Sequence, residues 1–368
     1  MSTKKDKFSL KDKFYMEIAL KLANSRQGLT GTNPSVGCVI VKNDKIVSIG
    51  QTSYNGRPHA EFNAIENCID DLNGSKMYVT LEPCCHHGLT PPCTNIIIKS
   101  KISEVIYSVA DIDRRVRNKS LKILKSNNIK VKKGLLSDKI NNFYSTYFFS
   151  RKYQLPYVTG KIAVSKNNLI YSKLNKKITN RHSDKFTHLL RYKNDALMVT
   201  YKTLNNDNSK LNCRIKGFSN FSPKRIILDN KLQTKINTYV INTANKNNTL
   251  IFYNQAKKSK ILEFKNKKIQ LIKSKINQQG KFDIKAILKK LYTHNCRNLL
   301  IEGGDSLTSH LLKNKIFNRF YLYKSPKNIS KETEYLKFNS LDVLKKNYKN
   351  KFNLNLFLGK DKITLYKN

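Results

Sequence analysis

The chain has 368 residues and carries 70 lysines and arginines against 25 aspartates and glutamates, a formal net charge of +45. This length suits two domains, and either half is long enough to bury a core of its own. Hydrophobic residues make up 39% of the chain and recur in short runs along its whole length, which excludes an intrinsically disordered protein.

The excess positive charge has two possible origins. A nucleic-acid-binding protein gathers its basic residues into one patch or stripe. Here the basic residues are mostly lysines scattered through the expected strands, helices and loops, asparagine and isoleucine are abundant, and tryptophan is absent. This composition is typical of an AT-biased coding sequence, so we expect no nucleic-acid partner. Such a surface would still attract a phosphorylated small molecule.

The sequence also bears on location and redox state. Residues 1–13 are polar and charged, without the apolar stretch of a secretory signal, and no apolar run approaches the ~20 residues of a membrane span. The chain has seven cysteines, an odd number. We therefore expect a cytoplasmic protein with no membrane association, whose thiols are metal ligands or core residues rather than disulfides.

The first half is predicted to alternate strands and helices. Its first helix, at 13–25, has Phe14, Ile18 and Leu22 at a spacing of four on its apolar face, which Met16, Ala19, Leu20 and Ala23 widen. The later elements are strands at 36–41, 45–51, 76–81, 104–110 and 129–131, and helices at 59–68, 94–99 and 118–126. This order predicts a three-layer α/β domain over residues 1–150.

One stretch of this half has the residues of a hydrolytic zinc site. Glu61 follows His59 by two positions, and Cys84 and Cys93 come after the strand predicted at 76–81. Three such ligands leave one tetrahedral position of zinc open to water, whose pKa falls from about 16 to about 7. A carboxylate that is not a ligand moves protons in such sites. We predict His59, Cys84 and Cys93 as metal ligands and Glu61 as the catalytic proton shuttle.

A structural zinc site, or a core histidine beside two buried thiols, is the alternative interpretation. Cys85, His86 and His87 are near enough in sequence for one of them to close the site as a fourth ligand. Glu61 favours the catalytic interpretation, because a structural site has no need of that carboxylate. On an ideal helix Glu61 would lie about 200° from His59, so an irregular first turn is required for both to reach one water.

The spacing of the two cysteines carries a family resemblance. The eight residues Cys-His-His-Gly-Leu-Thr-Pro-Pro separate Cys84 from Cys93, where zinc deaminases usually have two. This insert, with Asn33-Pro34-Ser35-Val36-Gly37 and Pro58-His59-Ala60-Glu61, closely resembles the pyrimidine deaminases of riboflavin biosynthesis. The resemblance extends over the second half, so the whole chain is similar to the bifunctional deaminase–reductases of that pathway.

The resemblance implies a cytidine-deaminase-like domain at 1–150 and a dihydrofolate-reductase-like α/β domain at 151–368. The first would use one Zn²⁺ to deaminate 2,5-diamino-6-(5-phosphoribosylamino)pyrimidin-4(3H)-one. Asn33 would bind the pyrimidine ring, although an Asn-Pro pair is also ordinary turn chemistry. The second domain would use NADPH to reduce the ribosyl side chain to ribityl, by hydride transfer to C1′.

The second half again alternates strands and helices, after a boundary near Leu155-Pro156-Tyr157. Glu302-Gly303-Gly304 lies between a predicted strand and helix, where the backbone can approach a phosphate. A helix is expected at 141–151, before the boundary. After the boundary, the expected strands are at 158–165, 196–200, 225–228, 249–253, 298–301, 352–358 and 362–366, and the helices at 184–193, 284–292 and 306–312.

The resemblance also implies reductase site residues. Those at cofactor positions are Ala163, Thr203, Asp207 and Gly304. Those at substrate positions are Arg191, Leu211, Arg214 and Glu302. Because guanidinium groups bind phosphate bidentately, the two arginines suit a ribose phosphate. A solvated surface charge is the alternative for each arginine.

Three stretches depart from the family pattern. Its Asp-Asp-Pro reads Asn206-Asp207-Asn208-Ser209, reckoned across one extra position. Its Ser-Leu-Asp-Gly turn reads Ser165-Lys166-Asn167-Asn168, and its Gln-Trp pair reads Lys176-Lys177, which removes an aromatic stacking surface near the cofactor. A deaminase whose second domain only binds a ligand or holds an oligomer is therefore an alternative function. A nucleic-acid base deaminase would use the charge of +45, but the long insert and the second domain speak against it.

We also expect a homo-oligomer of two or more chains.

Overall fold

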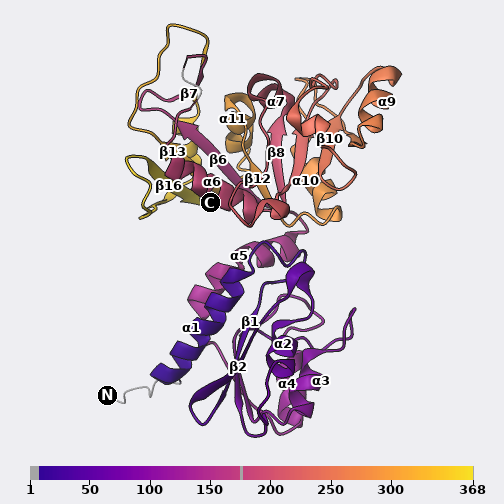
Figure 1. Cartoon of the computed structure of the whole chain (residues 1–368), viewed down its shortest axis with the longest axis vertical. Coiled ribbons are helices and arrows are strands. Elements are labelled where there is room, and N and C mark those ends of the chain that lie inside the picture. Colours follow the sequence, from indigo (N-terminus) through magenta and orange to yellow (C-terminus); the bar gives the residue numbers. More distant parts are fainter. Residues whose placement is uncertain (1–7, 175–176, 368) are drawn as a thin grey trace. The chain divides into compact units, whose positions relative to one another are not determined.

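The computed structural model describes residues 8–174 and 177–367. The chain divides into two compact units, Met1–Gln154 and Leu155–Asn368, called here the N-terminal and C-terminal units. Helices and strands alternate in each unit (Figure 1), so the predicted α/β class is confirmed in both halves.

The N-terminal unit is built on a five-stranded sheet in the order β2-β1-β3-β4-β5. β1 runs antiparallel to β2 and β3, whereas β3, β4 and β5 are parallel. The inner strands are buried on both faces, as expected for near-continuous apolar runs. The strands are β1 (Gly37–Lys42), β2 (Lys45–Gln51), β3 (Lys76–Leu81), β4 (Glu104–Val109) and β5 (Lys130–Lys133).

Helices cover both faces of this sheet and give the predicted three layers (Figure 1). α1 packs on β1 and β3 and α5 packs on β4, while α2 packs on β1 and β2 and contacts α3. A short 3-10 turn, Tyr54–Gly56, precedes α2. The helices are α1 (Leu10–Ser25), α2 (Ala60–Glu66), α3 (Cys93–Lys99), α4 (Lys119–Ser126) and α5 (Ser137–Tyr153).

The first helix starts earlier than predicted, and it buries most of the predicted apolar face but not Phe14. A capping box between Ser9 and Asp12 starts α1 at Leu10, with the Asp12 N–H donating to Ser9 Oγ at 3.1 Å. Phe14, placed on the apolar face by its spacing, is 60% exposed, so that part of the prediction is wrong. The buried residues of the helix are Tyr15, Met16, Ala19, Leu20 and Ala23.

Two glycines let helices approach the sheet from opposite sides. A Cβ at Gly37 would lie 1.9 Å from the carbonyl oxygen of Ala19 in α1, and one at Gly50 would lie 2.1 Å from that of Ala60 in α2. Gly50 pairs with Cys38, the neighbour of Gly37 in β1, so the two glycines face opposite sides of the sheet. The close contact at Gly50 fixes the position of α2, which carries Glu61.

The C-terminal unit contains a nine-stranded sheet in the order β11-β10-β9-β8-β12-β6-β13-β16-β15. The strands from β11 to β13 are parallel, and β16 and β15 add an antiparallel edge. A separate ribbon pairs β7 (Leu169–Ser172) with β14 (Tyr335–Lys337). The sheet strands are β6 (Tyr157–Val164), β8 (Ala196–Thr200), β9 (Lys224–Leu228), β10 (Thr249–Tyr253), β11 (Gln270–Lys273), β12 (Asn298–Ile301), β13 (Arg319–Lys324), β15 (Asn350–Asn353) and β16 (Lys362–Lys367).

Apolar clusters lie on both faces of this sheet. Leu299 and Ile301 of β12 belong to one cluster and Leu300 to the other, because successive side chains of a strand point to opposite faces. A 3-10 turn spans Ser219–Phe221. The helices are α6 (Arg181–Tyr192), α7 (Tyr201–Asp207), α8 (Tyr239–Asn242), α9 (Lys258–Asn266), α10 (Ile284–Thr293), α11 (Asp305–Lys313) and α12 (Leu341–Asn347).

The strand predicted at 352–358 is wrong in its second part. β15 ends at Asn353, and the chain then leaves the sheet edge so that Leu358 packs into a core cluster while Phe357 stays 88% exposed. The patterns also did not predict several elements, namely β7, α7, α8, α9, β11, β13, β14 and α12.

Candidate active sites

Three elements of the N-terminal unit bring the predicted metal ligands together. His59 is the N-cap of α2, Cys84 follows β3, and Cys93 is the first residue of α3. Nδ1 of His59 lies 3.4 Å from Sγ of Cys93 and 3.5 Å from Sγ of Cys84, and the three ligand atoms all lie within 4.8 Å of one another. Tetrahedral zinc bonds of ~2.05 Å to nitrogen and ~2.3 Å to sulfur would separate such atoms by about 3.5 Å. The donor set and its spacing fit a zinc ion.

The start of α3 is folded onto Cys84. Pro92 caps the helix, and the backbone N–H of Cys93 donates to the Cys84 sulfur at 3.3 Å. Hydrogen bonds lower the pKa of Cys84 to about 4, first from the Cys93 thiol and then from His59, although burial opposes them. One ligand of the cluster is therefore a thiolate at neutral pH, the form that binds zinc.

Glu61 lies in the first turn of α2 and is only 4% exposed. Burial raises the pKa of Glu61 to about 7, while the neighbouring His59 lowers it. His59 has extended backbone angles, φ −73° and ψ 163°, so it stands outside the helix. The ideal-helix separation of 200° therefore does not apply, and both side chains line one cavity.

A cavity of about 100 Å³ opens onto this cluster. Asn33 lines it, and the Nδ2 group of Asn33 donates to the carbonyl of Gly56 at 2.9 Å. The ring-binding role of Asn33 stays a prediction. The charged and polar residues of its lining, beyond the cluster and Glu61, include Arg57, Glu82, His86, Thr90, Asp111, Asp113, Arg115 and Arg151.

The metal cluster found in the described residues consists of three ligands. Cys85, considered as a fourth ligand, instead places its Sγ 3.5 Å from the carbonyl oxygen of Arg115. His86 lines the cavity, whereas His87 is exposed. A fourth coordination position is thus left for water, as a hydrolytic site requires.

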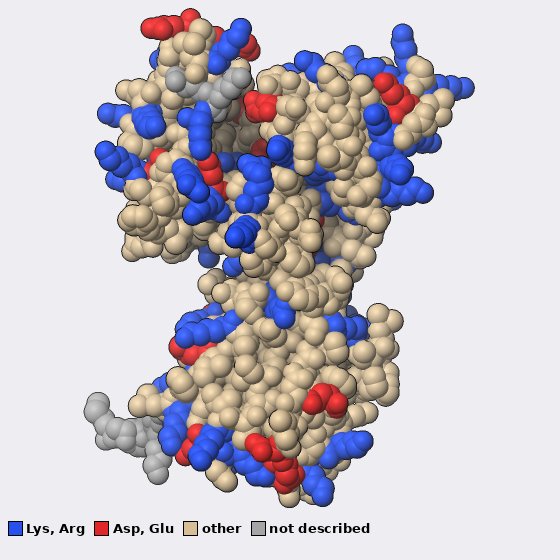
Figure 2. Space-filling model, in the orientation of Figure 1, with Lys and Arg blue, Asp and Glu red and all other residues tan. Residues whose placement is uncertain are grey.

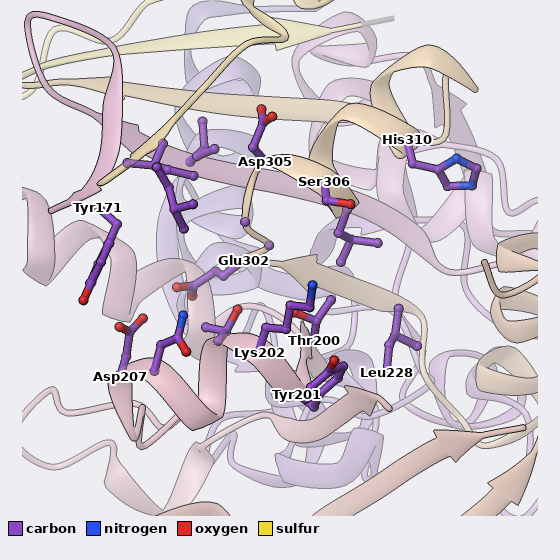
Figure 3. A pocket seen from close by; sticks show the side chains of 18 of the residues that line it. Tyr171, Thr200, Tyr201, Lys202, Asp207, Leu228, Glu302, Asp305, Ser306 and His310 are labelled. Carbon is purple, nitrogen blue, oxygen red and sulfur yellow. The ribbon is translucent and has the colours of Figure 1, made fainter. Parts of the chain in front are cut away.

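A larger cavity, of about 890 Å³, opens in the C-terminal unit where β8 and β12 end (Figure 3). α7 begins directly after β8, and α11 begins at Asp305, after Glu302-Gly303-Gly304. Figure 3 shows Glu302 near the centre, with Lys202 and Asp207 below it and Asp305 and Ser306 above. Ligands of α/β proteins bind at such carboxyl ends of strands, and helix N-termini favour phosphate.

The structure brings most of the predicted reductase residues to this cavity. Those that line it are Ala163, Thr203, Asp207, Glu302 and Gly304. Arg191, Leu211 and Arg214 lie outside its lining.

Arg191 is engaged by Glu302. Its Nε and Nη2 groups donate to the two carboxylate oxygens of Glu302, and its Nη1 group donates to the carbonyl of Asn212 at 3.1 Å. Leu211 is 2% exposed and packs in a core cluster, whereas the Arg214 side chain is exposed and donates to Asn212 Oδ1. Arg191 therefore links the carboxylate of Glu302 to the backbone of Asn212.

Comparison with known proteins places both units in one family. Residues 9–109 match the cytidine and deoxycytidylate deaminase zinc-binding region, and residues 160–346 match the RibD C-terminal domain. The riboflavin biosynthesis protein RibD of Aquifex aeolicus (strain VF5) is 33% identical over 318 residues, covering 86% of this chain and 87% of the relative. The chain belongs to the RibD family.

Solved structures agree with the RibD-family assignment. The diaminohydroxyphosphoribosylaminopyrimidine deaminase/5-amino-6-(5-phosphoribosylamino)uracil reductase of Thermotoga maritima is 27% identical, with a TM-score of 0.81 over 97% of this chain and 98% of that chain. RibD of Acinetobacter baumannii is similar in fold, with a TM-score of 0.84 at 24% identity and the same coverage. The predicted family and fold are confirmed: this is a RibD-family enzyme with a deaminase-type zinc-binding region and a reductase domain.

The departures from the RibD-family pattern have simple local structures. Asn168 has a φ of 61°, and the Ser165 hydroxyl donates to Asn167 Oδ1 and accepts from the Leu169 N–H, so the turn forms without glycine. Lys177 Nζ pairs with Asp184 at 2.9 Å and does not line the cavity. Lys176 lies outside the described residues.

Lys161 is a cavity residue of this RibD-family protein that the sequence patterns did not predict. It lies in β6, and its Nζ is 4.8 Å from the centroid of the Tyr323 ring. Burial lowers the pKa of Lys161, and the neighbouring Glu302 opposes this shift. Burial would raise the pKa of Glu302, but Arg191 and then Lys161 lower it to about 2. Lys161 interrupts the apolar strand predicted at 158–165, and this feature of the sequence could have indicated that it belongs to a site.

Among the helices in residues 8–174 and 177–367, none is both long enough and apolar enough to cross a bilayer.

Proposed function

We propose that this RibD-family enzyme catalyses two consecutive steps of riboflavin biosynthesis. The N-terminal unit removes the 2-amino group of 2,5-diamino-6-(5-phosphoribosylamino)pyrimidin-4(3H)-one. The C-terminal unit then reduces the ribosyl side chain of the product to ribityl with NADPH. The observation that carries the proposal is the cluster of His59, Cys84 and Cys93 with the buried Glu61 beside it, opening onto one cavity.

In the deaminase, His59, Cys84 and Cys93 hold one zinc ion, which supplies a nucleophilic water at neutral pH. Glu61 accepts a proton from the attacking water and delivers it to a ring nitrogen, and it then moves a second proton, from the newly added hydroxyl group, to the departing ammonia. A carboxyl group with a pKa of about 7 can carry the proton in both directions, which supports this role. Asn33 lines the same cavity, and we assign it a hydrogen bond to the ring.

In the reductase, the cavity of about 890 Å³ holds NADPH, which supplies the hydride for the ribose C1′. The cofactor residues are Ala163, Thr203, Asp207 and Gly304, all in the cavity lining. The α11 N-terminus directly after Gly304 favours a cofactor phosphate.

The substrate side of the reductase is assigned to the residues around Glu302. Its carboxylate faces the cavity between Arg191 and Lys161, which keep it ionised. The Arg214 side chain is exposed, so we assign it the direct contact with the ribose phosphate. Arg191 and Leu211 act indirectly, because they hold Glu302 and the segment 211–214 in place.

A nucleic-acid base deaminase is not favoured by the face shown in Figure 2. On the face shown in Figure 2, lysines and arginines are spread among other residues rather than gathered into one patch. Sequence-independent nucleic-acid binding needs a continuous basic surface along the strand. A small phosphorylated pyrimidine requires only the cavity and a local anion site.

Separate assays of the two half-reactions test the proposal. With the diaminopyrimidine substrate, the zinc-loaded protein should release ammonia, and a chelator should abolish this release until zinc is restored. With the deaminated pyrimidine, the same protein should oxidise NADPH before and after chelation, because that unit uses no zinc. Failure of ammonia release from the zinc-loaded protein would sink the deaminase assignment, and failure of NADPH oxidation would leave a deaminase with an inactive second unit.

The proposal includes a homo-oligomer of two or more chains. The mass of the purified protein in solution tests this part separately, since a monomer would contradict it without affecting either reaction.

A further inference from the structure

The deaminase cavity is too small to enclose a phosphoribosylated pyrimidine. Its volume of about 100 Å³ is below the roughly 300–1,000 Å³ of pockets that enclose drug-sized ligands. Because the reacting carbon must reach the metal cluster, the ring occupies the cavity and the sugar and phosphate extend to its mouth. The residues around the mouth therefore decide how the phosphate is held.

Three arginines line this cavity, and one of them is already neutralised. Arg115 binds Asp113 through two nitrogens, with Nε 3.0 Å from Oδ1 and Nη2 2.6 Å from Oδ2. Arg57 and Arg151 form no ion pair within the described ranges. Arg151 interacts with Asp111 only at longer range. Two of the three positive charges at the mouth are thus available to an anion.

Arg57 and Arg151 belong to the same rim of the cavity. Arg151, in the last turn of α5, donates from Nη2 to the carbonyl of Thr32 at 3.4 Å. The next residue, Asn33, donates to the carbonyl of Gly56, which directly precedes Arg57. Two hydrogen bonds and two peptide links therefore connect the arginines around one side of the mouth.

Both guanidinium groups keep donors for an anion. Arg57 donates from Nη1 to the Thr90 hydroxyl at 2.6 Å, and the same nitrogen lies 3.4 Å from Nε2 of His59, so one corner of the guanidinium group is anchored beside the metal cluster. The Nε of Arg151 is buried and has no hydrogen-bond partner within the described part of the chain. A buried donor without a partner costs free energy, and a phosphate oxygen would satisfy it.

We infer that Arg57 and Arg151 together bind the phosphate monoester of the deaminase substrate at the mouth of the cavity. Neither residue belongs to the metal cluster or to the proton shuttle, so they act in binding and orientation. The inference rests on the proposed deaminase function, and its test separates the two.

Single methionine variants of the two arginines test the inference, with a phosphorylated substrate and its dephosphorylated riboside compared. Arg57→Met and Arg151→Met should each raise KM for the phosphorylated substrate roughly 10- to 100-fold. The KM for the riboside should stay unchanged and zinc content should match that of the unaltered protein. Arg114→Met is the matched control, because Arg114 is exposed and does not line the cavity.

Inorganic phosphate gives a second readout that needs no phosphorylated substrate. It should competitively inhibit deamination of the riboside by the unaltered protein, and roughly 10-fold more weakly in Arg57→Met and Arg151→Met. Arg57→Lys and Arg151→Lys keep the charge but lose the bidentate geometry, so their KM values should fall between the two extremes. If a methionine variant loses zinc, the lysine variants and phosphate inhibition carry the test.

Two results would overturn the inference. Equal losses for the phosphorylated substrate and the riboside would mean that the arginines only shape the loops around Thr90 and Thr32. Unchanged KM for the phosphorylated substrate in both methionine variants would place the phosphate elsewhere. If the unaltered protein releases ammonia from neither substrate, the proposed deaminase function itself fails.

Discussion

Both carboxylate oxygens of Glu302 are held by the guanidinium of Arg191, at 2.8 Å from Nε and 2.9 Å from Nη2. Glu302 follows β12 and Arg191 lies in the last turn of α6, so the pair joins elements that are far apart in the sequence. The third nitrogen of Arg191 donates to Asn212. Arg191 therefore keeps the Glu302 carboxylate ionised and, through Asn212, also holds the segment 211–214 in position.

We expect Arg191→Met to destabilise the C-terminal unit by about 3–5 kcal/mol, because it leaves the Glu302 carboxylate buried without its main partner. Denaturant unfolding measures this change. The double variant Arg191→Met/Glu302→Gln should be less destabilised than Arg191→Met alone, since no uncompensated charge remains. Arg191→Met with the unfolding free energy of the unaltered protein would contradict the importance given to this ion pair.

We expect Glu61→Gln to lower the rate of ammonia release by about 10²- to 10⁴-fold, because the amide keeps the shape of the side chain but cannot accept the proton. Zinc content should not change, since Glu61 is not assigned as a ligand. Glu66→Gln is a matched control at the exposed end of the same helix and should retain full activity. Undiminished ammonia release by Glu61→Gln would rule out the assigned role.

We expect Gly50→Ala to lower both zinc content and melting temperature. Its Cβ would lie 2.1 Å from the Ala60 carbonyl oxygen and 2.5 Å from the Ala64 nitrogen, so α2 must move away from β2 and take Glu61 with it. Gly74→Ala is the control, because Gly74 meets nothing within 4 Å and its φ of +79° costs only about 1 kcal/mol. Equal melting temperatures and zinc contents for the two variants would show that the close contact is unimportant.

The C-terminal unit should lose stability as the pH falls from 6.5 to 4. His188 in α6 is 8% exposed, and its Nδ1 accepts from the backbone N–H of Arg214 at 3.4 Å. Burial, with help from Arg191 and Arg214, lowers the pKa of His188 from 6.5 to about 4. In this window the unfolded chain binds a proton that the folded unit does not, so stability falls as the pH is lowered.

Unfolding measured at pH 7 and pH 5 checks the role of His188. The variant His188→Gln should lose less stability between these two conditions than the unaltered protein, because glutamine does not titrate. The same loss in both proteins would assign the pH dependence to other groups.

The metal cluster could be predicted because its information is local. His59 and Glu61 are two positions apart, and Cys84 and Cys93 flank one insert, so each pair is visible as a motif. Strands such as β3 and β8 were also predicted with their observed bounds, because short apolar runs with clear ends mark buried strands.

Elements without such patterns could not be predicted. α9 buries only Phe264, so it has no apolar stripe to show a helical period, and β14 is exposed along its whole length. Phe14 has the spacing of the predicted apolar face but is exposed. The close contact of Ala19 with Gly37 decides which face of α1 is buried.

The charged contacts of the two sites join residues that are far apart in the chain, so the sequence could not predict them either. Nothing in the sequence around Arg191 shows that it will form an ion pair with Glu302, 111 positions later. Nor does the sequence show that Arg191 lies outside the cavity lining. The rim formed by Arg57 and Arg151 depends on two hydrogen bonds to backbone carbonyls, which no motif encodes. Lys161 differs, because a lysine in a buried strand is visible before folding.

One reaction mixture tests the central claim most directly. The zinc-loaded protein is given the diaminopyrimidine substrate and NADPH, and ammonia release and NADPH oxidation are followed together. The proposed function predicts that ammonia appears first and that NADPH oxidation then reaches the same amount, because the reductase consumes the deaminated product. Ammonia release with no NADPH oxidation would contradict the claim that both units are catalytic.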